Sequence, residues 1–147
     1  MMALVAAALS GAAMTVHAAV NGALSKAVGL VAATFVVQAV GLAASGLVLL
    51  GAGSLRHLGA MLGVPLVLWT GGLLGVFIVF TMAFTVPRTG AGLAVAVVLT
   101  AQLIAALIFD HFGLLGVPRA PVTWVRLLGA GLLLAGAWLV KAATPGR

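Results

Sequence analysis

Polar side chains lie inside segments of the chain that are otherwise apolar, and they are the residues best placed to do chemistry. In the first such segment they recur at intervals of four, three, four and four residues, which keeps them on one side of a helix. They are Ser10, Met14, His17, Asn21 and Ser25. A polar group in hydrocarbon is costly unless it meets a partner or water, so this side is expected to face other helices.

His17 and Asn21 are the strongest candidates on this face. We expect them toward the end of the helix, about 5 to 10 Å below its exit surface. They could contact a substrate, or they could join neighbouring helices through hydrogen bonds worth about 1 kcal/mol each. The spacing alone leaves both roles open.

Three further candidates lie on other segments. Gln38 is expected about 12 Å deep and Gln102 close to mid-membrane, where an amide must find a partner. Gln38 could serve packing or binding. Trp69 could belong to the aromatic belt at the membrane interface or form one wall of a central cavity. We include all three in a predicted substrate-binding site with His17 and Asn21.

Asp110 is the only acidic residue of the chain. It falls at the predicted C-terminal end of a helix, where the helix dipole disfavours negative charge. Arg119 or Arg126 is expected to hold it, or it caps the following segment, and Arg126 is the partner that we select. The pair could be structural, or Asp110 could bind a coupling ion or a proton.

The reactive residues do not form a catalytic constellation. The chain has one carboxylate and no cysteine, and its histidine and aspartate residues are expected at separate helix ends. Such a set provides neither a nucleophile with its base nor a group of metal ligands. We therefore predict no enzymatic activity, no catalytic residue, no metal site and no cofactor.

The composition decides which elements position these residues. Of the 147 residues 65% are hydrophobic and 5% charged, and the mean hydropathy is +1.38. A water-soluble fold could not bury so much apolar surface, and continuous apolar runs of about 20 residues exclude a membrane β-barrel. We predict an all-α polytopic helical bundle, a single transmembrane domain over 1–147. Its helices are expected at about 2–23, 30–52, 64–86, 90–109 and 124–141, and the first is expected to be retained rather than removed as a signal peptide.

The basic residues are spread singly between the apolar runs, although the formal net charge is +6. Such residues act as anchors at lipid headgroups, and they do not form the clustered basic surface that nucleic acid requires. Five spans put Arg56, Arg119 and Arg126 on the side of the N-terminus, and Lys26, Arg88, Lys141 and Arg147 on the other. The N-terminal side thus has three basic residues and the free amino group, and the other side has four basic residues. The positive-inside rule therefore gives almost no orientation signal.

A chain with balanced charges could insert both ways round. Two copies in opposite orientations would recreate the inverted repeats of secondary transporters. A parallel dimer, or pairing with a related second chain, stays open.

Motifs along nearly the whole chain resemble the YdcZ-like family of the drug/metabolite transporter superfamily. They are His17-xxx-Asn21-xx-Leu24, Trp69-x-Gly71-Gly72-xx-Gly75, Pro87-xx-Gly90, Gln102-Leu103, Asp110-xx-Gly113 and Arg126-xx-Gly129. Members of that family are small bacterial inner-membrane proteins of about five helices. They are related to the ten-helix EamA carriers, whose halves are inverted repeats, and to the four-helix small multidrug exporters. The resemblance implies half of an EamA-type transporter, working as a dimer.

Two departures qualify this resemblance. The family more usually has Gln where this chain has His17, a group that titrates near pH 6.5 and could add proton dependence or change the substrate. The chain also lacks the mid-membrane Glu with which small multidrug exporters exchange protons for cations.

The sequence thus predicts a multi-pass protein of the bacterial inner membrane that exports a small organic molecule by alternating access. Its expected partners are membrane lipid, the substrate and a second copy of the chain, with no nucleic acid. The alternative is a non-transporting subunit of another membrane protein, whose polar residues only pack helices.

Overall fold

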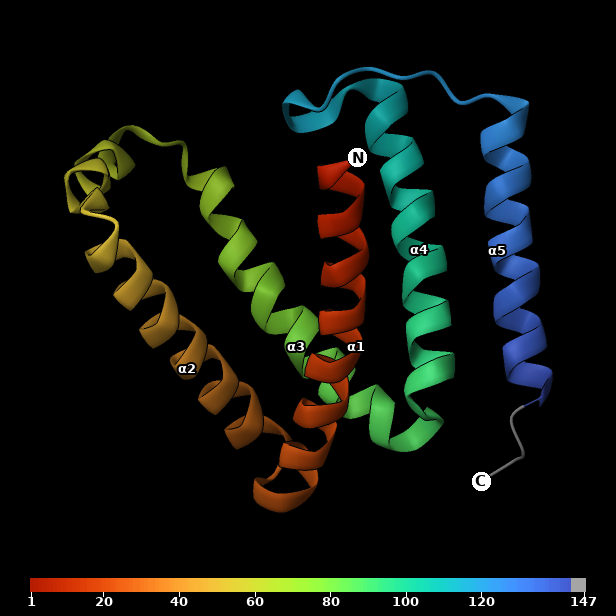
Figure 1. The fold of residues 1–147 in the computed structure, drawn as a ribbon, viewed down its shortest axis with the longest axis horizontal. Coiled ribbons are helices and arrows are strands. Elements are labelled where there is room, and N and C mark those ends of the chain that lie inside the picture. The colour runs from red at the N-terminus through yellow and green to blue at the C-terminus, as the bar shows by residue number, and fades with distance from the viewer. Residues whose placement is uncertain (144–147) are drawn as a thin grey trace. The chain divides into compact units, whose positions relative to one another are not determined.

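A computed structural model describes residues 1–143 and shows a helical chain (Figure 1). Its long helices are α1 (Met2–Val28), α2 (Leu30–Gly51), α3 (Thr70–Thr89), α4 (Ala91–Phe112) and α5 (Trp124–Ala143). The 3-10 helices η1 (Ser54–Gly63), η2 (Leu66–Trp69) and η3 (Leu114–Gly116) lie in the connections. No strand occurs among these residues, and Arg147, which entered the charge balance, lies outside them.

Five helical segments of the described chain have the length and composition of membrane spans. They contain 20 to 27 residues, with η2 and α3 forming one continuous segment, Leu66–Thr89. At 1.5 Å per residue, 20 residues cover the roughly 30 Å of a hydrocarbon core. The predicted polytopic helical architecture is therefore confirmed.

Helix α1 continues to Val28, beyond the predicted end near residue 23. Ser25 and Lys26 do not stop it, because Lys26 in the last turn complements the negative end of the helix dipole and can reach the headgroups. The helix ends at Gly29, whose φ of 86° is readily adopted only by glycine.

Helix α3 is displaced toward its C-terminus relative to the predicted range 64–86. The backbone at Pro65 is extended, with ψ 135°, so the chain enters α3 through the tight turn η2 rather than as an α-helix. At the other end α3 runs through Pro87 to Thr89, and Gly90, with φ 83°, makes the turn into α4. Helix α4 likewise extends three residues beyond the predicted end, to Phe112, where Gly113 terminates it in the left-handed conformation.

The chain divides into two compact units, residues 1–88 and residues 89–147. In the first unit, α2 packs against α1. In the second unit, α4 packs against α5, and η3 folds back on α4.

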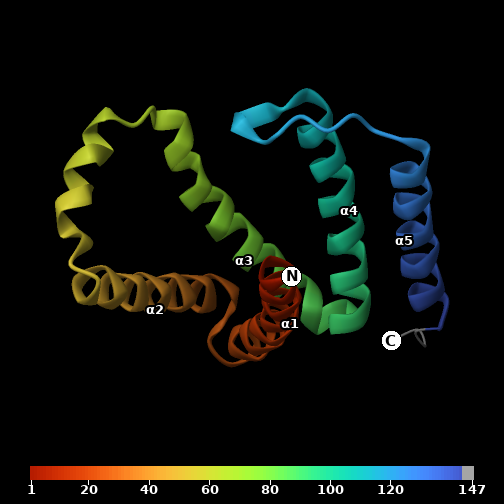
Figure 2. The same ribbon diagram turned by 45° about the horizontal axis from the view of Figure 1, so that its top comes forward.

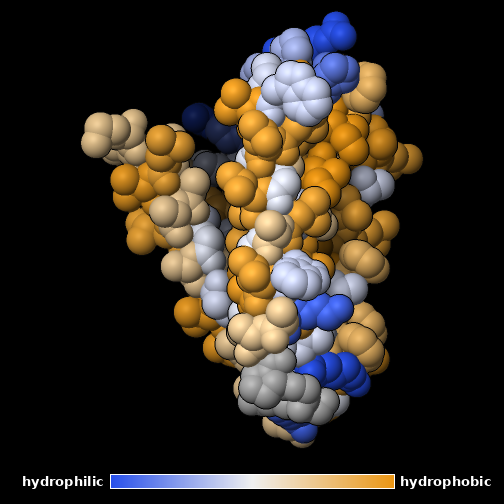
Figure 3. Space-filling model, turned by 90° about the vertical axis from the view of Figure 1, so that its right-hand side faces the viewer, coloured by the Kyte–Doolittle hydropathy of each residue, from blue (hydrophilic) through white to orange (hydrophobic). Residues whose placement is uncertain are grey.

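Small residues make up most of the buried core. Ala18, Ala33 and Ala83 are at most 2% exposed in the first unit, as is Ala94 in the second. Large apolar side chains point outward instead, and they cover the middle of the face in Figure 3, where hydrophilic residues gather toward the ends. Small residues let helix backbones approach closely, while hydrocarbon solvates the large side chains as well as a protein core would.

Candidate functional site

His17 and Asn21 form a hydrogen-bonded pair on α1. The side-chain amide nitrogen of Asn21 lies 3.1 Å from Nε2 and 3.4 Å from Nδ1 of His17, as their spacing of four residues allows. Asn21 is 2% exposed, whereas His17 is exposed. The buried amide thus holds an imidazole that remains accessible.

Because the amide N–H₂ can only donate, the ring nitrogen that accepts is the unprotonated one, and the tautomer of His17 decides which of the two it is. The longer α1 also places His17 11 residues before Val28, about 16 Å from the end of the helix.

Helices α1 and α3 pass close to each other in the first unit (Figures 1 and 2), and a polar contact joins them there. In an α-helix the carbonyl of Ala83 would accept a hydrogen bond from the N–H of residue 87, but Pro87 has none. The Ser25 hydroxyl lies 3.1 Å from this carbonyl oxygen and 2.9 Å from the carbonyl oxygen of Gly22. Ser25 can therefore satisfy the group that Pro87 leaves open.

The same junction is closely packed. A Cβ atom on Gly22 would lie 3.2 Å from Cγ of Pro87 and 3.4 Å from a methyl group of Val86. Glycine thus allows α1 to lie directly on the proline ring. The sequence pattern placed Ser25 on the polar face but did not reveal its partner. The sequence signal that could have indicated this partner is Pro87 itself, because a proline inside a helix leaves the carbonyl four residues before it, that of Ala83, without its usual donor.

Gln38 and Trp69 take separate positions in the first unit. The Gln38 amide nitrogen would be 3.8 Å from a Cβ atom on Gly75, so it lies where α2 comes close to α3. Trp69 is the last residue of η2, at the entrance to α3, and is 49% exposed. Its position at a span end fits the interfacial belt, and the role in a cavity wall remains a prediction.

Gln102 lies in the second unit on an exposed part of α4. The helix runs from Ala91 to Phe112, so Gln102 falls at its midpoint. A mid-membrane depth for this side chain stays a prediction.

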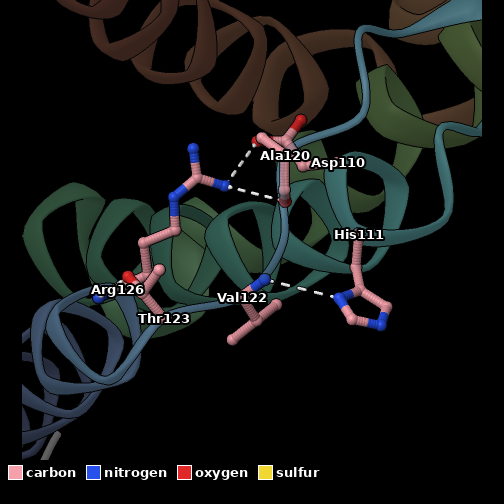
Figure 4. A network of polar contacts seen from close by, with 6 residues as sticks. All are labelled: Asp110, His111, Ala120, Val122, Thr123 and Arg126. Atoms are coloured by element: carbon pink, nitrogen blue, oxygen red, sulfur yellow. Dashed lines mark hydrogen bonds and ion pairs between the residues drawn. The ribbon is translucent and has the colours of Figure 1, made fainter.

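Asp110 and Arg126 are brought together at the α4–α5 connection (Figure 4). The guanidinium Nη1 of Arg126 is 3.1 Å from Oδ2 of Asp110 and also donates to the carbonyl oxygen of Ala120 at 3.3 Å. The two side chains are 37% and 33% exposed, so water screens the pair. Of the two arginines considered as partners, Arg126 makes this contact, while Nε of Arg119 donates to the carbonyl oxygen of His111.

His111 has a structural contact that sequence reasoning missed. The backbone N–H of Val122 donates to its Nδ1 at 3.3 Å, and the N–H of Ala120 donates to the Asp110 carbonyl at 2.8 Å. The last turn of α4 thus supplies acceptors to the segment that leads into α5. The signal in the sequence was weak: a polar pair beside a glycine that ends a helix.

An apolar groove of about 560 Å³ lies between α4 and α5 in the second unit. It is lined by Ile104, Leu107, Ile108, His111, Phe112, Val122, Leu127, Ala130 and Leu134. Only His111 is polar among these residues, so the groove is suited to hydrocarbon rather than to a polar substrate.

The structure therefore contains the predicted pair of Asp110 with Arg126, and it also pairs His17 with Asn21, a contact within one helix that the sequence analysis did not predict. His17, Asn21, Gln38 and Trp69 belong to the first unit, and Gln102, Asp110 and Arg126 to the second. A cavity shared by all five substrate-binding candidates stays a prediction.

Five apolar spans with polar side chains at membrane depth define a multi-pass helical membrane protein. Residues 2–139 match the family described as "Putative inner membrane exporter, YdcZ". The chain belongs to this YdcZ family, and its place is the inner membrane. The family description is that of a transporter rather than an enzyme. No curated protein and no solved structure gave a match to the chain.

Proposed function

We propose that the chain is a secondary transporter that exports a small organic molecule by alternating access, as a homodimer of oppositely oriented copies. The observation that carries the proposal is the His17–Asn21 pair, which presents an accessible imidazole at membrane depth. Burying polar groups in a span is unfavourable, and such groups in membrane proteins characteristically face a substrate pathway or the bundle interior.

The proposed site has His17, Asn21, Gln38, Trp69 and Gln102 as its substrate contacts. They provide neutral hydrogen-bond donors and acceptors with one aromatic face, and none is a fixed charge. This chemistry suits a neutral or zwitterionic molecule, or a hydrophobic cation held on the indole. Membrane lipid surrounds the site, and rocking of helices around it would give access to each side in turn.

Transport measurements on residue variants test the site. The purified chain would be reconstituted in liposomes and assayed for flux of a panel of neutral, zwitterionic and cationic organic compounds. We expect Asn21→Ala and His17→Ala each to lower flux roughly five- to thirtyfold, the effect of losing one buried hydrogen bond. His17→Gln should retain most of the flux, because an amide oxygen can still accept from Asn21.

Thr15→Val provides the matched control on α1, since the Thr15 hydroxyl is exposed and bonds to the Gly11 carbonyl of its own helix at 3.2 Å. Unchanged flux in the His17 and Asn21 variants would contradict the assignment of the site. A purified chain that moves no compound, yet forms a stable complex with another membrane protein, would favour the non-transporting subunit instead.

A further inference from the structure

Gln102 has no hydrogen-bond partner within the described chain, although it occupies the midpoint of an apolar span. The nearby Thr100 hydroxyl is satisfied locally, because it donates to the Ala96 carbonyl of its own helix at 2.9 Å. A glutamine amide has two N–H donors and one acceptor oxygen. A hydrogen bond to one backbone carbonyl of its own helix would leave the other donor and the oxygen unpaired. Its two donors and its acceptor oxygen therefore face outward from α4.

Hydrocarbon cannot form hydrogen bonds with the amide of Gln102. An unpaired amide transferred from water to an apolar medium costs several kcal/mol, about 4–8 on the strictest scale. Polar residues at this depth therefore face protein or a water-filled cavity. We therefore expect protein or a water-lined path, rather than lipid, to cover this side of α4 in the membrane.

The neighbours of Gln102 permit close approach by another helix. Ala101, Ala105 and Ala106 are exposed and lie next to it or one turn away. Their side chains end at Cβ, so they do not cover the amide and they allow another helix backbone to approach closely. The amide is thus accessible to a partner backbone or to a partner side chain.

We propose that the Gln102 amide pairs with Gln102 of a second, oppositely oriented copy of the chain. A primary amide is self-complementary, because each can donate one N–H to the oxygen of the other. In an antiparallel pair of α4 helices crossing at the midplane, a residue meets its own copy only at the midpoint of the span. Gln102 has that position, whereas a residue four positions before it would meet a residue four positions after it.

This contact rests on the homodimer proposed above and identifies where the two copies meet. The reciprocal pair uses one donor and one acceptor site of each amide. One N–H and one lone pair of each Gln102 remain for a substrate. The same residue can therefore join the two copies and line the path between them.

Cysteine cross-linking in native membranes tests the geometry, because the chain contains no cysteine of its own. Val98→Cys and Ala106→Cys chains with different tags would be co-expressed with Gln102 intact, then oxidised. We expect a mixed 98–106 disulfide dimer at least several times more abundant than the 98–98 and 106–106 dimers. Predominant 98–98 and 106–106 dimers would overturn the proposal, because they indicate parallel helices.

The amide itself is tested in the same cysteine pair. Gln102→Leu should weaken the dimer roughly 3- to 30-fold, the range for interhelical hydrogen bonds in membranes. Gln102→Asn, which keeps the amide, should retain part of the mixed dimer. Thr100→Val is the matched control and should leave it unchanged, since that hydroxyl bonds within its own helix.

Single-molecule counting of the labelled wild-type chain in dilute bilayers separates this contact from the proposed function. If counting detects dimers but the cysteine variants give no 98–106 disulfide, the Gln102 contact is wrong while the proposed homodimer is retained. A chain that remains monomeric yet transports would overturn both the contact and the dimer. Dimers whose yield is the same in Gln102→Leu as in wild type would show that the amide does not join the copies.

Discussion

At the scale of single residues, the chain uses its few polar groups in pairs. Asn21 orients His17 on α1, and Arg126 binds the only carboxylate of the chain, Asp110. The first pair lies well inside a span, whereas the second lies at the α4–α5 connection and is partly exposed. Their environments suggest different work: ligand binding for the first, and either joining of elements or ion coupling for the second.

The Asp110–Arg126 pair allows these two roles to be distinguished. Because water screens a pair of this exposure, a double-mutant cycle with Asp110→Asn and Arg126→Gln should give a coupling energy below about 1 kcal/mol. The measurement is the free energy of unfolding in mixed micelles. Flux driven by a pH gradient should fall little in Asp110→Asn if the role is structural. Complete loss of driven flux, with stability nearly unchanged, would instead assign ion or proton coupling to Asp110.

At the scale of elements, the junction of α1 and α3 shows how a proline is accommodated inside a helix. Pro87 would leave the Ala83 carbonyl without its usual partner, and in a bilayer no water is at hand to replace it. The Ser25 hydroxyl from α1 approaches that oxygen at 3.1 Å, and Gly22 leaves room for the proline ring. The two helices are therefore joined by a hydrogen bond that the proline makes necessary.

Substitutions at this junction should be strongly non-additive. Ser25→Ala is expected to destabilise the chain by about 1–2 kcal/mol, because the Ala83 carbonyl loses its donor. In a Pro87→Ala background the same change should cost much less, since residue 87 again supplies a backbone N–H. Unfolding titrations of the four chains in mixed micelles give both values. Equal costs in the two backgrounds would show that Ser25 does not serve the carbonyl that Pro87 leaves open.

At the scale of the whole molecule, the dominant property is a balance of charge across five spans. Arg56 lies in η1 between α2 and α3, while Lys26 and Arg88 lie at the opposite ends of their spans, in the last turns of α1 and α3. Neither side holds the excess of basic residues that normally sets orientation. The dual orientation proposed above would therefore follow from a few side chains rather than from the fold.

Orientation can be read from a side-sensitive reporter on the C-terminus of the chain expressed alone. We expect a mixture near one to one. Ala60→Lys, in η1, should shift the population toward an outside C-terminus, and Ala27→Lys should shift it the opposite way, since both positions are exposed and border opposite sides. A single orientation that neither lysine changes would contradict the antiparallel homodimer and indicate a parallel dimer or an oppositely oriented partner chain.

The sequence by itself determined the membrane location, the helical class and the five spans, because apolar length is a local property that the bilayer imposes on each segment. It also predicted which polar residues share the face of α1, since helical periodicity needs no knowledge of neighbours. Helix ends were less predictable: neither Lys26 nor Pro87 ends its helix, and Gly29 and Gly90 turn the chain instead.

Only the tertiary structure decided which polar groups meet. Arg126 rather than Arg119 binds Asp110 because the segment after α4 folds back onto its last turn. Ser25 reaches the Ala83 carbonyl 58 positions along the chain because Gly22 lets α1 lie against Pro87. Such contacts depend on how two separate elements approach each other, and residue spacing within one element carries no information about that approach.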